Sequence, residues 1–101
     1  METWFRAVVN TEAKVIFVAE QDCEVKIHVP KIKPGLEQQN NSLVFVQPGD
    51  NKPTDSYSGL PMPFDTPYPI FLETGDKLWA ESSGETMIGA TVFPWNSGRK
   101  S

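Results

Sequence analysis

The stretch that decides the fold is Ile70-Phe-Leu-Glu-Thr-Gly-Asp-Lys-Leu-Trp-Ala-Glu-Ser-Ser83, followed by Met87-Ile-Gly-Ala-Thr-Val-Phe93. An apolar run stops at Gly75-Asp76, and a second run alternates apolar and polar residues before a serine-rich break. Aromatic and β-branched residues favour strands, whereas glycine, aspartate and serine favour the turns between strands. The stretch therefore predicts three strands joined by two tight turns, and it places the chain in the all-β class.

Further runs of strand-forming residues precede this stretch. In one of them Val25, Ile27 and Val29 alternate with polar residues, which predicts that these three side chains face the core. Another run, 14–19, is apolar on both faces, which predicts a strand in the middle of a sheet. These runs predict four further strands: Trp4–Val9, Lys14–Ala19, Glu24–Val29 and Leu43–Val46.

About seven strands in 101 residues predict one domain, 1–101, built as a single antiparallel β-sandwich. Jelly-roll-like and immunoglobulin-like wirings both fit this strand pattern. The Cys–Trp–Cys pattern of true immunoglobulin domains is absent, because Cys23 is the only cysteine. Hydrophobic residues make up 39% of the chain and charged residues 22%, which is the balance of a folded domain and not of a disordered one.

The region 48–69 contains six prolines together with Tyr57, Phe64 and Tyr68. Proline cannot donate a hydrogen bond to a sheet, so this region is not a central strand. Prolines and aromatic residues together favour a stiff, extended segment that lies against a surface. Two interpretations stay open: a long loop folded over the protein's own core, or an arm that docks on a neighbouring chain.

The residue types needed for catalysis are scarce. A hydrolytic triad needs a base beside a nucleophile, and the only imidazole, His28, lies on the polar side of a predicted strand. A zinc site needs several cysteines and histidines, and the chain has one of each. We therefore expect no enzyme, no metal and no cofactor; a small hydrolase would need two carboxylates close together in a cleft.

Charge and hydropathy narrow the possible partners. The net charge is −4 and the basic residues do not cluster along the sequence, so we expect no nucleic-acid binding. No apolar run approaches 18 residues, and the first residues lack the pattern of a secretory signal, so we expect no membrane span and synthesis in the cytoplasm.

Three tryptophans are many for a chain of this length. Trp4 and Trp95 lie near the two ends, and they could share one patch if the first and last strands are neighbours. Trp79 lies in a predicted strand and could belong either to the core or to a face. Exposed tryptophan is typical of protein interfaces and of sugar-binding faces, whereas the simpler interpretation is that the indoles close the ends of the sandwich.

The pattern across Ala13–Ile32 and Ile70–Phe93 resembles a group of small bacteriophage virion proteins. The shared features are a strand that ends at the polar break Asn10-Thr11, a hairpin that leads into an alternating strand, and the closing strands around Gly75-Asp76. The resemblance covers about half of the chain and does not include the proline-rich region. Proteins of this group decorate capsids, or sit at the neck, tail or fibre, in many copies on a larger scaffold.

The resemblance implies a non-enzymatic structural component of a phage particle. Our first expectation is a capsid decoration or cement protein that docks on the major capsid protein; a neck, tail or fibre attachment protein is the nearest alternative. A carbohydrate-binding module of the sandwich type is the main rival. We expect localisation in the virion, many copies or a homo-oligomer, and docking through Trp4, Tyr57, Phe64, Tyr68 and Trp95.

Overall fold

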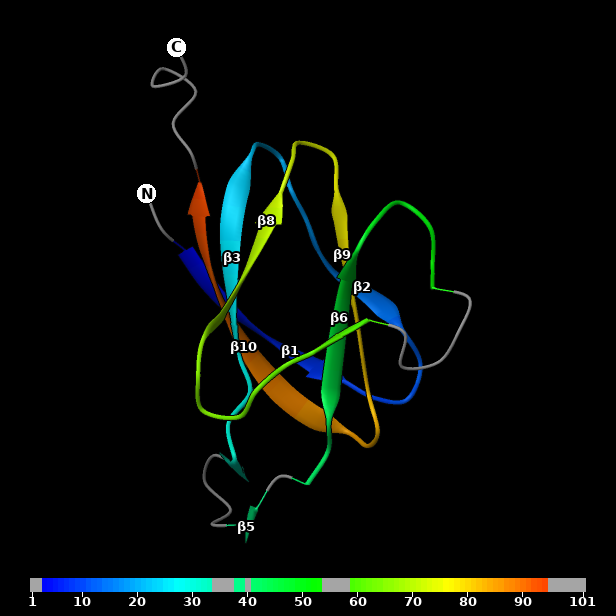
Figure 1. Ribbon diagram of the computed structural model, residues 1–101, viewed down its shortest axis with the longest axis vertical. Coiled ribbons are helices and arrows are strands. Elements are labelled where there is room, and N and C mark those ends of the chain that lie inside the picture. Colours follow the sequence, from blue (N-terminus) through cyan, green and yellow to red (C-terminus); the bar gives the residue numbers. More distant parts are fainter. Residues whose placement is uncertain (1–2, 34–37, 40, 54–58, 95–101) are drawn as a thin grey trace.

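The computed structural model describes residues 3–33, 38–39, 41–53 and 59–94. The described chain contains ten strands, and no helix is present in these ranges (Figure 1). The strands are β1 (Thr3–Val9), β2 (Lys14–Val18), β3 (Cys23–His28), β4 (Ile32–Lys33), β5 (Gln38–Gln39), β6 (Val44–Pro48), β7 (Leu60–Pro61), β8 (Tyr68–Leu72), β9 (Lys77–Ser82) and β10 (Thr86–Pro94).

Eight of these strands form two four-stranded antiparallel sheets. Sheet A has the order β1-β10-β3-β8 and sheet B the order β2-β9-β6-β7, while β4 and β5 pair separately. In Figure 1 β3, β8 and β10 lie on the left and β6, β9 and β2 on the right. The all-β sandwich predicted from the sequence is confirmed.

The wiring of the eight strands is that of a jelly roll. With β4 and β5 left aside, the first strand pairs with the last (β1 with β10) and the second with the next to last (β2 with β9). The third and fourth strands continue this order, because β3 pairs with β8 and β6 pairs with β7. This nesting arises when one long antiparallel hairpin of four strand pairs is wrapped into two sheets. The pairings of β10 with β3 and of β6 with β9 then complete the sheets. The jelly-roll alternative therefore applies, and the immunoglobulin-like wiring does not.

The core lies between the two sheets and is made of aliphatic side chains. Val25, Ile27 and Val29 are completely buried, as their alternation predicted. Side chains on successive strand positions point to opposite faces, so the residues between them face solvent. Phe5 and Phe17 extend the core from opposite sheets, with stacked rings whose centroids are 5.7 Å apart. Burial of these side chains is the main favourable term in the stability of the fold.

The position predicted for the run 14–19 was wrong. The strand in this run, β2, pairs only with β9 and forms an edge of sheet B. Val15 and Val18 are exposed, and a bulge between Val15 and Phe17 interrupts the pairing. The run is apolar on both sides because Phe17 faces the core while the two valines lie on a surface, and an apolar pattern alone cannot distinguish such an edge from a central strand.

The described parts of the proline-rich region lie on the protein's own sheets. Met62 is buried and its N–H donates to the carbonyl of Val44 at 2.8 Å, and β7 pairs with β6. Phe64 forms an isolated bridge with Val29. Met62 and Phe64 thus pack against the protein's own core, and docking of this region on a neighbouring chain stays a prediction.

Candidate binding face

The outer face of sheet A is the most exposed apolar surface among the described residues. Alternation along the strands directs one set of side chains away from the core. The register brings these side chains into rows: Trp4 lies opposite Thr91, and Phe93 opposite Glu24. We call this surface the aromatic face; its members are Trp4, Arg6, Val8, Glu24, Lys26, His28, Phe71, Met87, Thr91 and Phe93.

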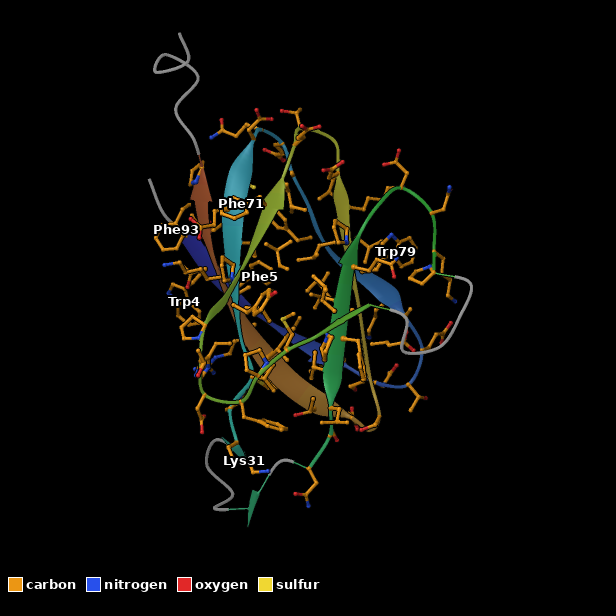
Figure 2. The ribbon with its side chains drawn as sticks, in the orientation of Figure 1. Trp4, Phe5, Lys31, Phe71, Trp79 and Phe93 are labelled. Carbon is orange, nitrogen blue, oxygen red and sulfur yellow. The ribbon has the colours of Figure 1, made fainter. Side chains whose placement is uncertain are left out.

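Three aromatic rings mark this face. Trp4 on β1 is 66% exposed and Phe71 on β8 is 61% exposed, so the two most exposed rings lie on the two edge strands of sheet A. Phe93 is half-buried on β10, between them. Figure 2 shows Trp4 and Phe93 on the outer left side of the molecule, whereas Phe5 lies between the sheets. Large aromatic side chains that are exposed in the free protein would gain favourable burial in a complex, so this surface is a candidate binding site.

Two cations lie over two of these rings. The guanidinium carbon of Arg6 is 5.4 Å from the ring centroid of Trp4, and the Nζ of Lys26 is 5.3 Å from that of Phe93. Each such contact at an exposed site contributes about 0.5–1 kcal/mol. The cations hold the rings in place and give the face a positive character in a chain whose net charge is −4.

The structure places the predicted docking residues in different environments. Trp4 is exposed on the aromatic face. Phe64 and Tyr68 are partly buried against the core, and the Nζ of Lys31 lies 4.4 Å from the ring centroid of Phe64. Tyr57 and Trp95 lie outside the described residues. The first and last described strands are neighbours, as the idea of a shared tryptophan patch requires.

The aromatic face also contains residues that no sequence pattern marked as parts of a binding surface: Phe71, Phe93, Arg6 and Lys26. The sequence did contain a signal for Phe71, which lies between two aliphatic residues, Ile70 and Leu72. Successive side chains of a strand point to opposite faces, so Phe71 points away from the face on which Ile70 and Leu72 are buried. The sequence could not predict that the Arg6 and Lys26 side chains lie on the same face, because this depends on which strands are neighbours in the sheet.

The outer face of sheet B is different, because the chain itself covers the part around Trp79, while Val15 and Val18 on β2 stay exposed. Trp79 on β9 is half-buried, and its indole N–H donates to the carbonyl oxygen of Gly49 at 3.0 Å. Pro53 and Gly59 line the shallow depression around this indole. In Figure 2 Trp79 lies on the right, beside the segment that leaves β6. The tryptophan in β9 therefore supports a loop of the protein itself, whereas the exposed rings of the aromatic face have no such cover from the described residues.

A hollow of about 350 Å³ lies at one end of the sandwich, between the two sheets. Phe17, Val92 and Pro94 supply apolar lining, and Glu20 and Gln21 supply polar lining. Cys23 also lines it but is only 2% exposed. Within the described ranges, no group of three His, Cys, Asp or Glu side chains could hold a metal ion.

Burial raises the pKa of the Cys23 thiol above its ordinary value of 9.0, and the negative charge of Asp22 adds to this shift. Above about pH 9 the unfolded chain therefore binds fewer protons than the folded one, so the free energy of unfolding falls as pH rises. We expect Cys23→Ala to remove this part of the alkaline loss, in urea unfolding measured at several pH values. Curves for the two proteins that stay parallel through the alkaline range would contradict the assignment.

The described part of the chain has no helix long and apolar enough to cross a membrane. The chain has no significant match among protein-family models, curated proteins or solved structures. What the chain does must therefore be argued from its own residues and their arrangement.

Proposed function

We propose that the chain is a non-enzymatic docking module and a structural component of a bacteriophage particle, with a capsid decoration protein as the first choice. In this role the aromatic face binds the major capsid protein, and many copies cover the shell. The observation that carries the proposal is the exposure of Trp4 and Phe71 on one sheet that also presents two cations, whereas the tryptophan of the other sheet is partly covered by the protein's own chain.

The composition of the aromatic face suits a protein partner. Protein interfaces are enriched in tryptophan, phenylalanine, methionine and arginine, and a few such anchors carry most of the binding energy. Arg6 and Lys26 favour a partner surface that combines apolar groups with carboxylates. Because both cations already lie over aromatic rings, they are held in place before the partner arrives, which lowers the entropy cost of binding.

The fold and the sequence resemblance favour the virion as the setting. Jelly rolls occur in viral capsid domains and in lectins. A fold hosts many functions, so this supports the setting by analogy only, and the binding role depends on the aromatic face. A neck, tail or fibre attachment protein would use the same face on a different scaffold, and localisation by electron microscopy of labelled particles distinguishes these positions.

The proposal predicts that Trp4→Ala combined with Phe71→Ala weakens binding to the particle at least tenfold, because removal of two exposed aromatic anchors costs more than about 1.4 kcal/mol. The measurement is co-sedimentation of the purified chain with shells of the major capsid protein of the phage that encodes it. Both side chains are exposed, so the thermal unfolding of the free double variant should stay close to that of the parent.

A matched control comes from the other sheet. Val18 and Leu60 are exposed apolar residues of sheet B, at 47% and 46%. Val18→Ala combined with Leu60→Ala removes a similar kind of surface outside the aromatic face, and it should leave binding to shells unchanged. Equal binding of both double variants would reject the aromatic face as the docking surface.

A carbohydrate-binding module is the second candidate, favoured by the presence of three aromatic rings on one exposed sheet face. Sugars stack on the open faces of such rings. Arg6 and Lys26 occupy one side of Trp4 and of Phe93, which leaves less ring area for a sugar and favours the protein partner. Binding on a glycan array that Trp4→Ala abolishes, with no binding to shells, would establish the second candidate instead.

A further inference from the structure

The four edges of the two sheets differ in how they are protected against pairing with another chain. An edge strand exposes unpaired N–H and C=O groups, and proteins usually blunt it with prolines, bulges or a short length. Edge strand β8 contains Pro69, β2 has a bulge, and β7 is two residues long and contains Pro61. Each of these three edges thus carries a device that hinders strand addition.

The edge at β1 has no proline and no bulge and is not short; its one charged residue is Arg6. Its seven residues, Thr3–Val9, contain no proline, and they pair with β10 from Thr3 to Val9 without a break in register. Among the described residues, no hydrogen bond joins β1 to anything other than β10. Valine, phenylalanine and tryptophan are strong strand formers, so this is a long and regular edge that nothing in the described ranges pairs with on its outer side.

We propose that β1 is a self-association edge: a second copy of the chain adds its own β1 in antiparallel orientation across a two-fold axis. The two copies of sheet A then form one continuous eight-stranded sheet. Such an interface is self-complementary, as a two-fold dimer requires. Main-chain hydrogen bonds supply the affinity, and the outward side chains decide the register.

The register centred on Phe5 gives the side chains of β1 a favourable pairing of cation and ring on the outer face. Residues directly opposite each other must point to the same face, so only every second register is allowed. With Phe5 opposite Phe5 of the second copy, Trp4 lies opposite Arg6 of the second copy, which creates two new contacts between a cation and an aromatic ring. The next register would place Arg6 opposite Arg6 of the second copy, and like charges directly opposite destabilise a strand pair.

The dimer would bring two aromatic faces side by side on the same side of the joined sheet. This goes beyond the proposed docking role and does not depend on it, because the dimer forms without any other partner. An interface of one strand pair is small, so we expect a reversible dimer with a dissociation constant on the order of 10–100 µM.

Analytical ultracentrifugation from about 10 µM to about 1 mM tests the association. The parent chain should pass from monomer to dimer, and Arg6→Glu should weaken the dimer at least tenfold because it removes both contacts to Trp4. Lys26→Glu makes the same charge change on the same face, two strands away from the edge, and should leave the dimer unchanged. A parent chain that stays monomeric throughout, or equal effects of both variants, would overturn the proposal.

Disulfide trapping tests the register. Opposite positions in an antiparallel pair have the Cα separation that a disulfide needs. A mixture of Trp4→Cys and Arg6→Cys proteins should form a covalent heterodimer under mild oxidation, whereas neither protein alone should form a covalent dimer through these positions. Covalent dimers of Trp4→Cys alone or of Arg6→Cys alone would show another register and contradict the proposal. Because Cys23 is 2% exposed, it does not compete in the folded protein.

Discussion

Replacing Leu78 with alanine is expected to lower the free energy of unfolding by about 3–5 kcal/mol, the upper part of the range for a buried leucine. Leu78 is completely buried on β9, the strand of sheet B that pairs with both β2 and β6. Strands on both sides and a second sheet in front of the side chain prevent the structure from collapsing into the space left behind. A domain of about 100 residues has a total stability of only about 5–15 kcal/mol, so this one change removes a large part of it.

Urea unfolding followed by tryptophan fluorescence measures the effect, and Leu43→Ala is the matched control. Leu43 is 50% exposed, and its N–H and C=O groups bond to Ser83, so the substitution leaves these backbone bonds in place. We expect the control to change the stability by about 0.5 kcal/mol or less. Equal losses for the two leucines would mean that the core does not lie between the two sheets as described.

The strands themselves could be predicted because their signals are local. Alternation in 24–29 identified the inward side chains, and Gly75-Asp76 marked a real turn. Gly75 has φ 93°, a conformation that glycine adopts without strain, and the Asp76 carboxylate accepts the backbone N–H of Glu73 at 2.9 Å. The alternation and the turn depend only on residues close together in the sequence, so both can be predicted from the sequence alone.

The binding face could be predicted only in part because it depends on wiring. Trp4 was identified by its residue type, whereas Phe71 and Phe93 join it because β8 and β10 belong to the same sheet as β1. The edge position of β2 was missed for the same reason. Strand order is set by the packing of the whole chain, and an apolar run fits a central strand or an edge equally well until its neighbours are known.

Gly59→Ala is expected to destabilise the protein by about 2–3 kcal/mol. A Cβ at Gly59 would lie 2.6 Å from the carbonyl oxygen of Val46 and 2.9 Å from its carbonyl carbon. Both atoms belong to the backbone of β6, which is held in sheet B by β9, so they cannot move aside as the end of a flexible side chain could. The close approach lets the chain enter β7 and close the last pair of the jelly roll, and the added methyl group must push these strands apart.

Gly89→Ala is the control with the opposite expected sign. Gly89 lies in β10 opposite His28, its φ is not positive, and a Cβ there would meet only the carbonyl oxygen of His28 at 4.0 Å. Alanine fits this space and reduces the freedom of the unfolded chain, so we expect a gain of about 0.5–1 kcal/mol. Chemical unfolding of both variants measures the difference. A Gly59→Ala protein as stable as Gly89→Ala would mean that β7 does not lie against β6 as closely as the structure has it, and the pairing that completes the jelly roll would have to be reconsidered.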